Sequence, residues 1–250
     1  MSQPDTFVII DGNSLMHRAF HALPPLSNAD GVYTNAVFGF LSMLFKVVGD
    51  EQPRYLAVAF DLHGPTFRHK DYSEYKAGRK PTAPELRPQF DLVRECLEKM
   101  GVKILTCPTF EADDILGTFA RRCEEAGIPA LLVTGDRDSM QLVTKTSNVL
   151  YTRRGVSDVV RYTPEKVLED FGVTPAQIPD LKGLMGDASD NIPGIPGIGE
   201  KTAIKLLSAY GTLENALDHA EADLKGKQRE KMIDGRMSGL MSKKIATITR

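Results

Sequence analysis

The sequence predicts an α/β protein, in which a mostly parallel central sheet is flanked by helices and followed by an all-helical subdomain. Two observations predict this fold. Up to about residue 163, short β-branched runs alternate with longer stretches of helical periodicity, the pattern of βαβ units. After Thr163 and Pro164 no convincing strand pattern recurs. We therefore expect an α/β core over residues 1–173, which includes a polar segment at 62–88, and a helical subdomain over 174–250.

The core elements are expected in alternating order along the chain. Strands are predicted at 7–10, 55–60, 102–105, 130–134 and 149–152, and helices at 37–48, 86–100 and 112–126. The last helix should stop where Gly127 and Pro129 follow it. The longest apolar stretch, 36–48, is too short for a bilayer and contains Lys46, so it is predicted to be a core helix. No membrane span is expected.

The composition narrows the class of protein. With 250 residues, 42% hydrophobic and 26% charged, the chain is expected to be a globular protein of one large or two modest domains. Its three cysteines are odd in number and form no CxxC pair, which argues against a disulfide framework or a zinc knuckle. No secretory leader is recognisable at residue 1, so we expect a cytoplasmic protein.

The charge is unevenly distributed. The formal net charge of −2 does not suggest a nucleic-acid binder. Residues 225–250, however, carry eight Lys and Arg against two acidic residues. Such a helical surface can hold a polyanion, although a simply solvated helix face explains it as well.

Carboxylates gather where the predicted strands end. Since parallel strands place their carboxyl ends at one edge of the sheet, where open α/β folds bind ligands, these groups should share a cleft. So many like charges require a cation, and hard divalent cations prefer oxygen ligands, so Mg²⁺ or Mn²⁺ is expected. Any one of these residues could instead be a helix cap or turn residue. The candidates are Asp11, Asp61, Glu111, Asp113, Asp114, Asp136, Asp138, Asp187 and Asp190.

The segment 62–88 interrupts the α/β pattern and begins beside Asp61. Six basic residues alternate there with Phe67, Tyr72 and Tyr75. A connection of this length inside a compact domain is typically a functional lid or a disordered linker. Cations combined with aromatic rings suit phosphate contact and base stacking, which favours the lid.

A glycine-rich hairpin precedes a helix predicted at 202–210. Closely spaced glycines bring backbone N–H groups near an anion at the start of a helix, and a lysine adds charge, so a phosphate-binding site is predicted. The spacing does not fit GxxxxGK[ST], which argues against a nucleotide-hydrolysing P-loop. The residues concerned are Gly194, Gly197, Ile198, Gly199, Lys201 and Thr202.

Six segments of the chain carry a resemblance to a known family. They are, in order, FVIIDGNSLMHRAF, VAFD, YKAGR, FEADDILGTFA, TGDRD and GDASDNIPGIPGIGEKTA. With these segments the chain resembles the 5′ nuclease (5′-3′ exonuclease) domain of bacterial DNA polymerase I, a relative of the flap endonucleases. The resemblance implies a PIN-like core, a helical arch at 62–88, and a helix-hairpin-helix subdomain.

The same resemblance implies roles for the acidic residues. It implies a structure-specific nuclease that removes 5′ flaps and RNA primers from duplex DNA with two divalent metal ions. Asp11, Asp61, Glu111 and Asp113 would bind the first ion, and Asp136, Asp138 and Asp187 the second. Asp114 and Asp190 would act as outer partners through water.

It also implies roles for basic residues and partners. Tyr75, Lys76 and Arg79 would reach the scissile phosphate, and Arg18 would steady it. The hairpin would hold duplex backbone, with K⁺ on its main-chain carbonyls. A monomer associated with the bacterial nucleoid is expected, within a longer parent chain carrying a polymerase domain or as a stand-alone nuclease. Two other functions remain open: a catalytically silent DNA-binding module, and a PIN-like single-strand ribonuclease.

Overall fold

The computed structural model describes residues 5–155 and 158–250, which form two compact units. The first, here called the α/β unit, contains the residues up to Gly64 together with Pro81–Thr163 and Thr249–Arg250. The second, here called the helical unit, contains Pro65–Lys80 and Pro164–Ile248.

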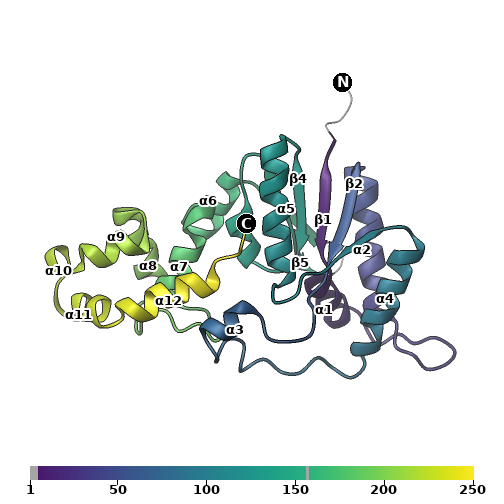
Figure 1. Cartoon of the computed structure of the whole chain (residues 1–250), viewed down its shortest axis with the longest axis horizontal. Coiled ribbons are helices and arrows are strands. Elements are labelled where there is room, and N and C mark those ends of the chain that lie inside the picture. Colours follow the sequence, from purple (N-terminus) through teal and green to yellow (C-terminus); the bar gives the residue numbers. More distant parts are fainter. Residues whose placement is uncertain (1–4, 156–157) are drawn as a thin grey trace. The chain divides into compact units, whose positions relative to one another are not determined.

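A six-stranded sheet forms the centre of the α/β unit (Figure 1). Its order is β3-β2-β1-β4-β5-β6, and all neighbouring strands are parallel except β5 and β6. The chain leaves β1 for β2 on one side and returns to β4 on the other, which makes the β1–β4 boundary the switch point where such sheets bind ligands. The strands are β1 (Phe7–Asp11), β2 (Tyr55–Ala59), β3 (Lys103–Leu105), β4 (Ala130–Thr134), β5 (Ser147–Arg154) and β6 (Asp158–Tyr162).

The mostly parallel sheet is confirmed, and all five predicted strands are present. The sequence analysis missed β6, which pairs antiparallel with β5 at the sheet edge. Its pattern is ambiguous because most of its side chains are only half-buried. By contrast, β4 is buried along its whole length, as expected for a strand covered on both faces.

Helices pack on the sheet and form the main core. Side chains of α1, α2 and α4 meet alternate strand residues such as Val8, Ile10 and Val133. Helix α5 contacts β1, β2 and β4. No helix within residues 5–155 and 158–250 is long and apolar enough to cross a membrane. The helices of this unit are α1 (Gly12–Ala22), α2 (Asn35–Glu51), α4 (Arg87–Lys99) and α5 (Ala112–Ala126), with a 3₁₀ turn at Asp138–Leu142.

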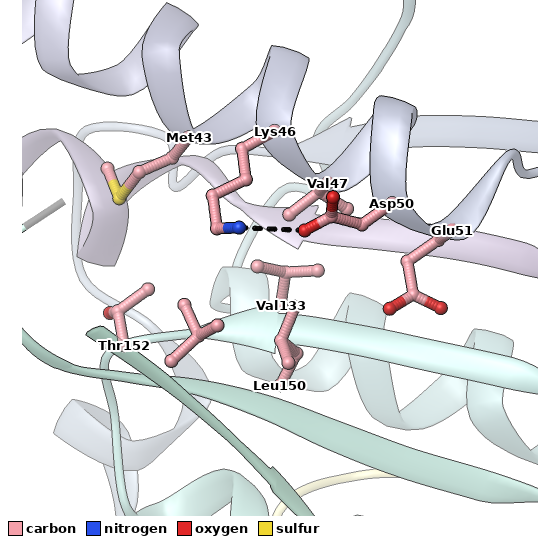
Figure 2. A pocket seen from close by; sticks show the side chains of 9 residues that line it. Met43, Lys46, Val47, Asp50, Glu51, Val133, Leu150 and Thr152 are labelled. Carbon is pink, nitrogen blue, oxygen red and sulfur yellow. Dashed lines mark hydrogen bonds and ion pairs between the residues drawn. The ribbon is translucent and has the colours of Figure 1, made fainter. Parts of the chain in front are cut away.

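A small cavity lies between α2 and the sheet (Figure 2). Its volume is about 40 Å³, room for roughly one water molecule. Lys46 and Asp50, which line it, form an ion pair of 2.8 Å across one helical turn. The cavity is a packing gap of the core, too small for a ligand.

The helical unit is built around the pairing of α7 with α12. Gly183 and Gly239 allow this close approach, because a Cβ atom added to Gly183 would lie 3.1 Å from the Gly239 carbonyl oxygen. The helices are α3 (Phe67–Asp71), α6 (Pro164–Phe171), α7 (Ile178–Met185), α8 (Glu200–Tyr210), α9 (Leu213–Asp218), α10 (Ala220–Asp223), α11 (Gly226–Asp234) and α12 (Arg236–Ala246), with a 3₁₀ turn at Pro175–Gln177.

Residues 65–80 group with the helical unit, whereas the sequence analysis placed 62–88 in the core. Arg68 shows one reason. It is buried, and its guanidinium donates from Nε to the Ile245 carbonyl at 3.0 Å and from Nη2 to the Thr247 carbonyl at 3.1 Å. These contacts fasten the segment to the carboxyl end of α12, where a helix attracts positive charge. Sequence pattern cannot show such a tertiary anchor.

Candidate active site

Asp11 lies at the switch point of the sheet, where it caps helix α1 and has a raised pKa. Its Oδ1 accepts from the Ser14 amide at 2.9 Å, which caps α1, and its Oδ2 accepts from the Thr134 hydroxyl at 2.9 Å. Burial, with smaller contributions from the charges of Asp61 and Asp136, raises the pKa of Asp11 to about 7. The capping alternative is therefore correct for this residue, but capping does not remove the repulsion from its acidic neighbours.

Asp61 follows β2 and contacts the start of α5. Its Oδ1 accepts from the Ala112 amide at 2.6 Å, while its own amide donates to Asn13 Oδ1 at 3.1 Å. The N-terminus of a helix attracts negative charge, so the start of α5 is a favourable position for the Asp61 carboxylate.

Asp136 completes the acidic edge after β4. Its amide donates to the Thr134 hydroxyl at 3.0 Å, and its Oδ1 accepts from the Asp138 amide at 2.9 Å. The adjacent Gly135 amide donates to Ser14 Oγ at 2.9 Å. Thr134 thus contacts both acids, since its hydroxyl donates to the Asp11 carboxylate and accepts from the Asp136 backbone amide. The sequence analysis missed Thr134; its only signal is a hydroxyl at the last position of an apolar strand. We refer to Asp11, Asp61 and Asp136 as the acidic rim.

The FEADD motif divides into residues with different environments. Glu111 and Asp114 form a capping box at the start of α5, in which Asp114 Oδ2 accepts from the Glu111 amide at 3.0 Å. Asp114 is 2% exposed, and its Oδ1 accepts from the Thr249 amide at 2.9 Å. Asp113 is half-buried and accepts from Ser139 Oγ at 3.3 Å. The contacts of Asp114 are those of a structural residue, and Asp113 is the more accessible of the two.

Arg18 braces the loop that carries Asp136. Its Nη1 donates to the Arg153 carbonyl at 3.2 Å and its Nη2 to the Gly135 carbonyl at 3.3 Å. The structure therefore places this predicted phosphate-contacting residue at the loop after β4, where it is held by main-chain oxygens.

The donor set of the acidic rim fits a hard divalent cation. All its side-chain donors are oxygens, which Mg²⁺ and Mn²⁺ prefer. Asp11 and Asp136 make no ion pair with a basic residue in the described part of the chain, so their mutual repulsion is not offset by Lys or Arg. In residues 5–155 and 158–250, no three His, Cys, Asp or Glu side chains already form a cage that could hold a metal ion.

Asp187 and Asp190 belong to the helical unit, and basic residues of that unit engage both. Burial by itself would raise the pKa of Asp187, but the Lys182 ammonium and bonds from Ser189 outweigh it and lower the pKa to about 2. Asp190 is buried and accepts from Tyr75 Oη at 3.1 Å and from the Arg79 guanidinium.

Tyr75, Lys76 and Arg79, which the sequence analysis placed in an arch, are bonded to the same turn. Besides the side-chain contacts of Tyr75 and Arg79 with Asp190, the Lys76 amide donates to the Asp190 carbonyl at 2.9 Å. Lys76 has a left-handed backbone with φ of 57°, and its ammonium lies 4.9 Å from the Tyr75 ring centre. Asn191 Nδ2 also donates to the Glu74 carbonyl at 2.7 Å. Asp190 is therefore the hub of a hydrogen-bond network that holds residues 74–79.

The glycine-rich hairpin separates into a buried part and an exposed part. Gly194 must be glycine, because its φ is +62° and an added Cβ would lie 2.2 Å from the Gly186 nitrogen. Its amide and carbonyl are bonded to Ser242 and Ser238. Ile198 is buried as well. These residues shape the turn and do not offer their groups to a ligand.

The exposed part of the hairpin leads into α8. Gly199 is its N-cap residue, an added Cβ there would meet nothing within 4 Å, and Lys201 is exposed while Thr202 is half-buried. The Gly197 carbonyl accepts from the Lys231 ammonium at 2.9 Å. The accessible start of α8 fits the predicted phosphate site, and a cationic side chain already lies at one hairpin carbonyl.

Two family models together match residues 6–250. A family model described as 5′-3′ exonuclease, N-terminal resolvase-like domain, matches residues 6–172. A second, described as 5′-3′ exonuclease, C-terminal SAM fold, matches residues 173–250.

Curated relatives are longer than this chain. DNA polymerase I of Bacillus caldotenax is 50% identical over 244 residues, which is 97% of this chain and 28% of that protein. DNA polymerase I of Bacillus subtilis is 48% identical over 248 residues, 99% of this chain and again 28% of the relative. The chain thus spans little more than a quarter of the length of these relatives.

Solved structures share the fold. The 5′-exonuclease of T5, in a structure with bound zinc ions, gives a TM-score of 0.80 at 22% identity and covers 96% of this chain and 89% of its own. A bacteriophage T5 flap endonuclease variant in complex with DNA and metal ions gives 0.77 at 21% identity, with coverage of 95% and 87%. These matches bear out the predicted PIN-like core with a C-terminal helical domain.

Proposed function

The chain belongs to the 5′-3′ exonuclease family, and from this premise we propose that it is a metal-dependent hydrolase that cleaves DNA or RNA-primer phosphodiesters near a 5′ end or 5′ flap. The observation that carries the proposal is the acidic rim at the sheet's switch point. A phosphodiester could not approach these like charges unless cations reversed the local sign. The family relationship also supports DNA replication and repair as the setting.

The acidic rim would hold the catalytic cation, Mg²⁺ or Mn²⁺, with Asp113 and Glu111 beside it at the start of α5. When bound, such ions supply a hydroxide nucleophile and stabilise the departing 3′ oxygen. Thr134, Ser14 and the start of α5 fix the carboxylate oxygens in advance, so the protein does not reorganise when the charge changes. The second ion of the two-metal interpretation is assigned to Asp136 and Asp138; Asp187 stays a candidate from the sequence alone.

The helical unit would bind the substrate. Arg79 and Lys76 are the cations proposed to offset charge developing on the phosphate, with Tyr75 beside them. The start of α8, with Gly199 and Lys201, would hold duplex backbone together with the basic residues of 225–250. Affinity for duplex DNA should therefore fall as salt rises. K⁺ on the main-chain carbonyls of the hairpin is an additional proposal; at the Gly197 carbonyl it would have to displace the Lys231 ammonium.

Asp136→Asn tests this function, because asparagine keeps the hydrogen bond from the Asp138 amide and removes the charge. We expect single-turnover cleavage of a 5′-flap duplex in Mg²⁺ to fall by about 100- to 1,000-fold, the usual effect of removing one electrostatic stabiliser. Duplex affinity should stay within about twofold by fluorescence anisotropy, since the substitution removes no basic contact. Asp50→Asn, at an exposed position near the end of α2, is the matched control.

The alternatives give different results in the same assay. A silent DNA-binding module would bind the flap duplex but not cleave it, with Mg²⁺ or with chelator. A PIN-like ribonuclease would cleave unstructured RNA in preference to the flap substrate. Undiminished cleavage by Asp136→Asn would contradict the metal-binding role of the acidic rim.

A further inference from the structure

The first turn of α1 contacts the chain beyond both strands that flank β1 in the sheet. Asn13 Oδ1 accepts from the Asp61 amide at 3.1 Å, just past the end of β2. Ser14 Oγ accepts from the Gly135 amide at 2.9 Å, just past the end of β4. Asp61 belongs to the acidic rim, and Gly135 directly precedes Asp136 of the rim. Two consecutive side chains of one helix therefore hold the backbone that carries two rim carboxylates.

Helix geometry explains how one turn can serve two strands. Consecutive residues of an α-helix are separated by about 100° around its axis, so Asn13 and Ser14 point to different sides of α1. Strand β1 lies between β2 and β4, and α1 begins directly after β1. Asparagine and serine side chains readily bond to nearby backbone groups. The segment 11–14 thus places one acceptor beside each neighbour of β1.

The backbone around these contacts is closely packed. Gly12 is buried at the start of α1, and a Cβ atom added to it would collide with the Phe60 ring. A Cβ atom added to Gly135 would lie 3.0 Å from Ser14 Oγ. Arg18, one turn further along α1, donates to the Gly135 carbonyl at 3.3 Å. Gly135 is therefore held at its amide by Ser14 and at its carbonyl by Arg18.

These two hydrogen bonds are not part of the capping of α1. The Ser14 amide already caps the helix by donating to Asp11 Oδ1 at 2.9 Å, so the Ser14 hydroxyl is not needed for that purpose. The Asn13 and Ser14 side chains instead accept from amides 48 and 121 positions away in the chain. They fix the spacing between separate loops. Groups that orient metal ligands in this way, without touching the metal, strongly affect its affinity.

We propose that Asn13 and Ser14 are positioning residues for the divalent cation of the acidic rim. Asn13 sets the place of Asp61 relative to Asp11, and Ser14 sets the place of Asp136. The proposal rests on the proposed function, because it requires a divalent cation at the rim. Loss of either acceptor lets one loop move, so that the carboxylates fit the cation less well while the substrate-binding residues of the helical unit are unchanged.

The first measurement is Mn²⁺ binding to the full chain without DNA, by isothermal titration calorimetry. Asn13→Ala and Ser14→Ala should each weaken Mn²⁺ binding about tenfold, the lower end of the usual effect of removing a group that orients a metal ligand. Ser42→Ala on α2 is the matched control. It removes a hydroxyl that donates to the Phe38 carbonyl at 2.7 Å, and it should leave Mn²⁺ affinity unchanged.

The second measurement separates positioning from a merely structural role. Both alanine variants should need about tenfold more Mg²⁺ for half-maximal cleavage of a 5′-flap duplex, while their affinity for that duplex in Ca²⁺ stays the same. A merely structural role would lower the thermal stability of the metal-free protein and leave the Mg²⁺ dependence unchanged. If thermal unfolding shows that Asn13→Ala does not fold, Ser14→Ala decides the question.

Two outcomes overturn the proposal: unchanged Mn²⁺ affinity in the folded alanine variants, or a loss in Ser42→Ala as large as that in Ser14→Ala. If the unmodified chain binds Mn²⁺ and cleaves the flap in either case, the positioning roles are wrong and the proposed function stands. An unmodified chain that neither binds Mn²⁺ nor cleaves the flap would overturn the proposed function and this proposal with it.

Discussion

Both units contain buried carboxylates, but those of the helical unit are paired with a basic side chain of the same unit, whereas Asp11 of the α/β unit has no such partner among the described residues. In the helical unit, Asp180 accepts from the Lys243 ammonium at 2.6 Å and from the Leu213 amide at 2.8 Å, and Asp187 pairs with Lys182. In the α/β unit, Asp11 is 4% exposed, and hydrogen bonds leave its pKa near 7. Buried charges are normally neutralised by partners.

The difference separates structural acids from functional ones. Where a basic side chain of the same unit compensates a buried carboxylate, the acid is explained by stability. Where compensation by a basic residue is lacking, and burial together with smaller contributions from like charges raises the pKa, the site fits the cation that we propose. Asp11 of the acidic rim meets the second description, and Asp180 and Asp187 meet the first.

The largest stability effect should come from Asp11→Asn in the metal-free protein. Asparagine is also a good N-cap, and its amide can donate to the Thr134 hydroxyl, so the substitution removes mainly the cost of burying a charge, with a smaller part from repulsion by Asp61 and Asp136. The raised folded pKa means that wild-type stability falls as pH rises from about 4 to about 7. At pH 8 the variant should be more stable by on the order of 2 to 4 kcal/mol. Urea unfolding at pH 5 and pH 8 measures this.

Mg²⁺ should narrow this difference in stability between the variant and wild type. Because the cation offsets the repulsion in wild type but loses a ligand charge in the variant, wild type should gain more thermal stability from Mg²⁺ than Asp11→Asn does. A variant that is less stable than wild type at pH 8 without metal would remove the basis of the comparison between the two units.

A smaller effect of the opposite sign is expected for Asp190→Ala in the helical unit. The substitution leaves Tyr75 and Arg79 without their shared acceptor. Since Arg79 is half exposed, its loss is screened, and unfolding should become easier by about 1 to 2 kcal/mol. Hydrogen exchange at residues 72–80 should accelerate. Asp190→Asn keeps one acceptor oxygen, so its free energy of unfolding should lie between those of wild type and the alanine variant. Unchanged hydrogen exchange in the alanine variant would contradict the role of Asp190 as hub.

The smallest effect should come from an exposed pair. Lys46 and Asp50 are bonded at 2.8 Å but are largely solvated, with side-chain exposures of 43% and 59% (Figure 2). Lys46→Gln should change the free energy of unfolding by less than about 0.5 kcal/mol, as thermal unfolding in low and high salt can measure. A larger loss of stability would mean that an ion pair stabilises the fold even when it is exposed. Burial would then not be what distinguishes the two classes of carboxylate.

The sequence was sufficient for the parallel strands of the sheet, but not for the edge strand β6 or for every residue's role. Strand β4 and helix α5 have the predicted bounds, because buried apolar runs and a Gly stop are local signals. Asp114 shows the limit: the sequence places it in the acidic motif, yet its oxygens accept from the Glu111 and Thr249 amides. Thr249 is distant in sequence, so no local pattern indicates this contact. Asn13 was missed for the same reason, because its partner is the Asp61 amide.

By itself, the sequence determined the alternation of strands and helices, the family resemblance, and the acids at strand ends, because periodicity and motif order are properties of consecutive residues. The tertiary structure decided which acids are compensated, why residues 65–80 group with the helical unit, and which backbone amides the first turn of α1 holds. The physical reason is that burial and Coulomb interactions depend on distance in space. Asp11 and Asp136 are 125 positions apart in the chain, and only the β1–β4 pairing brings their charges into interaction.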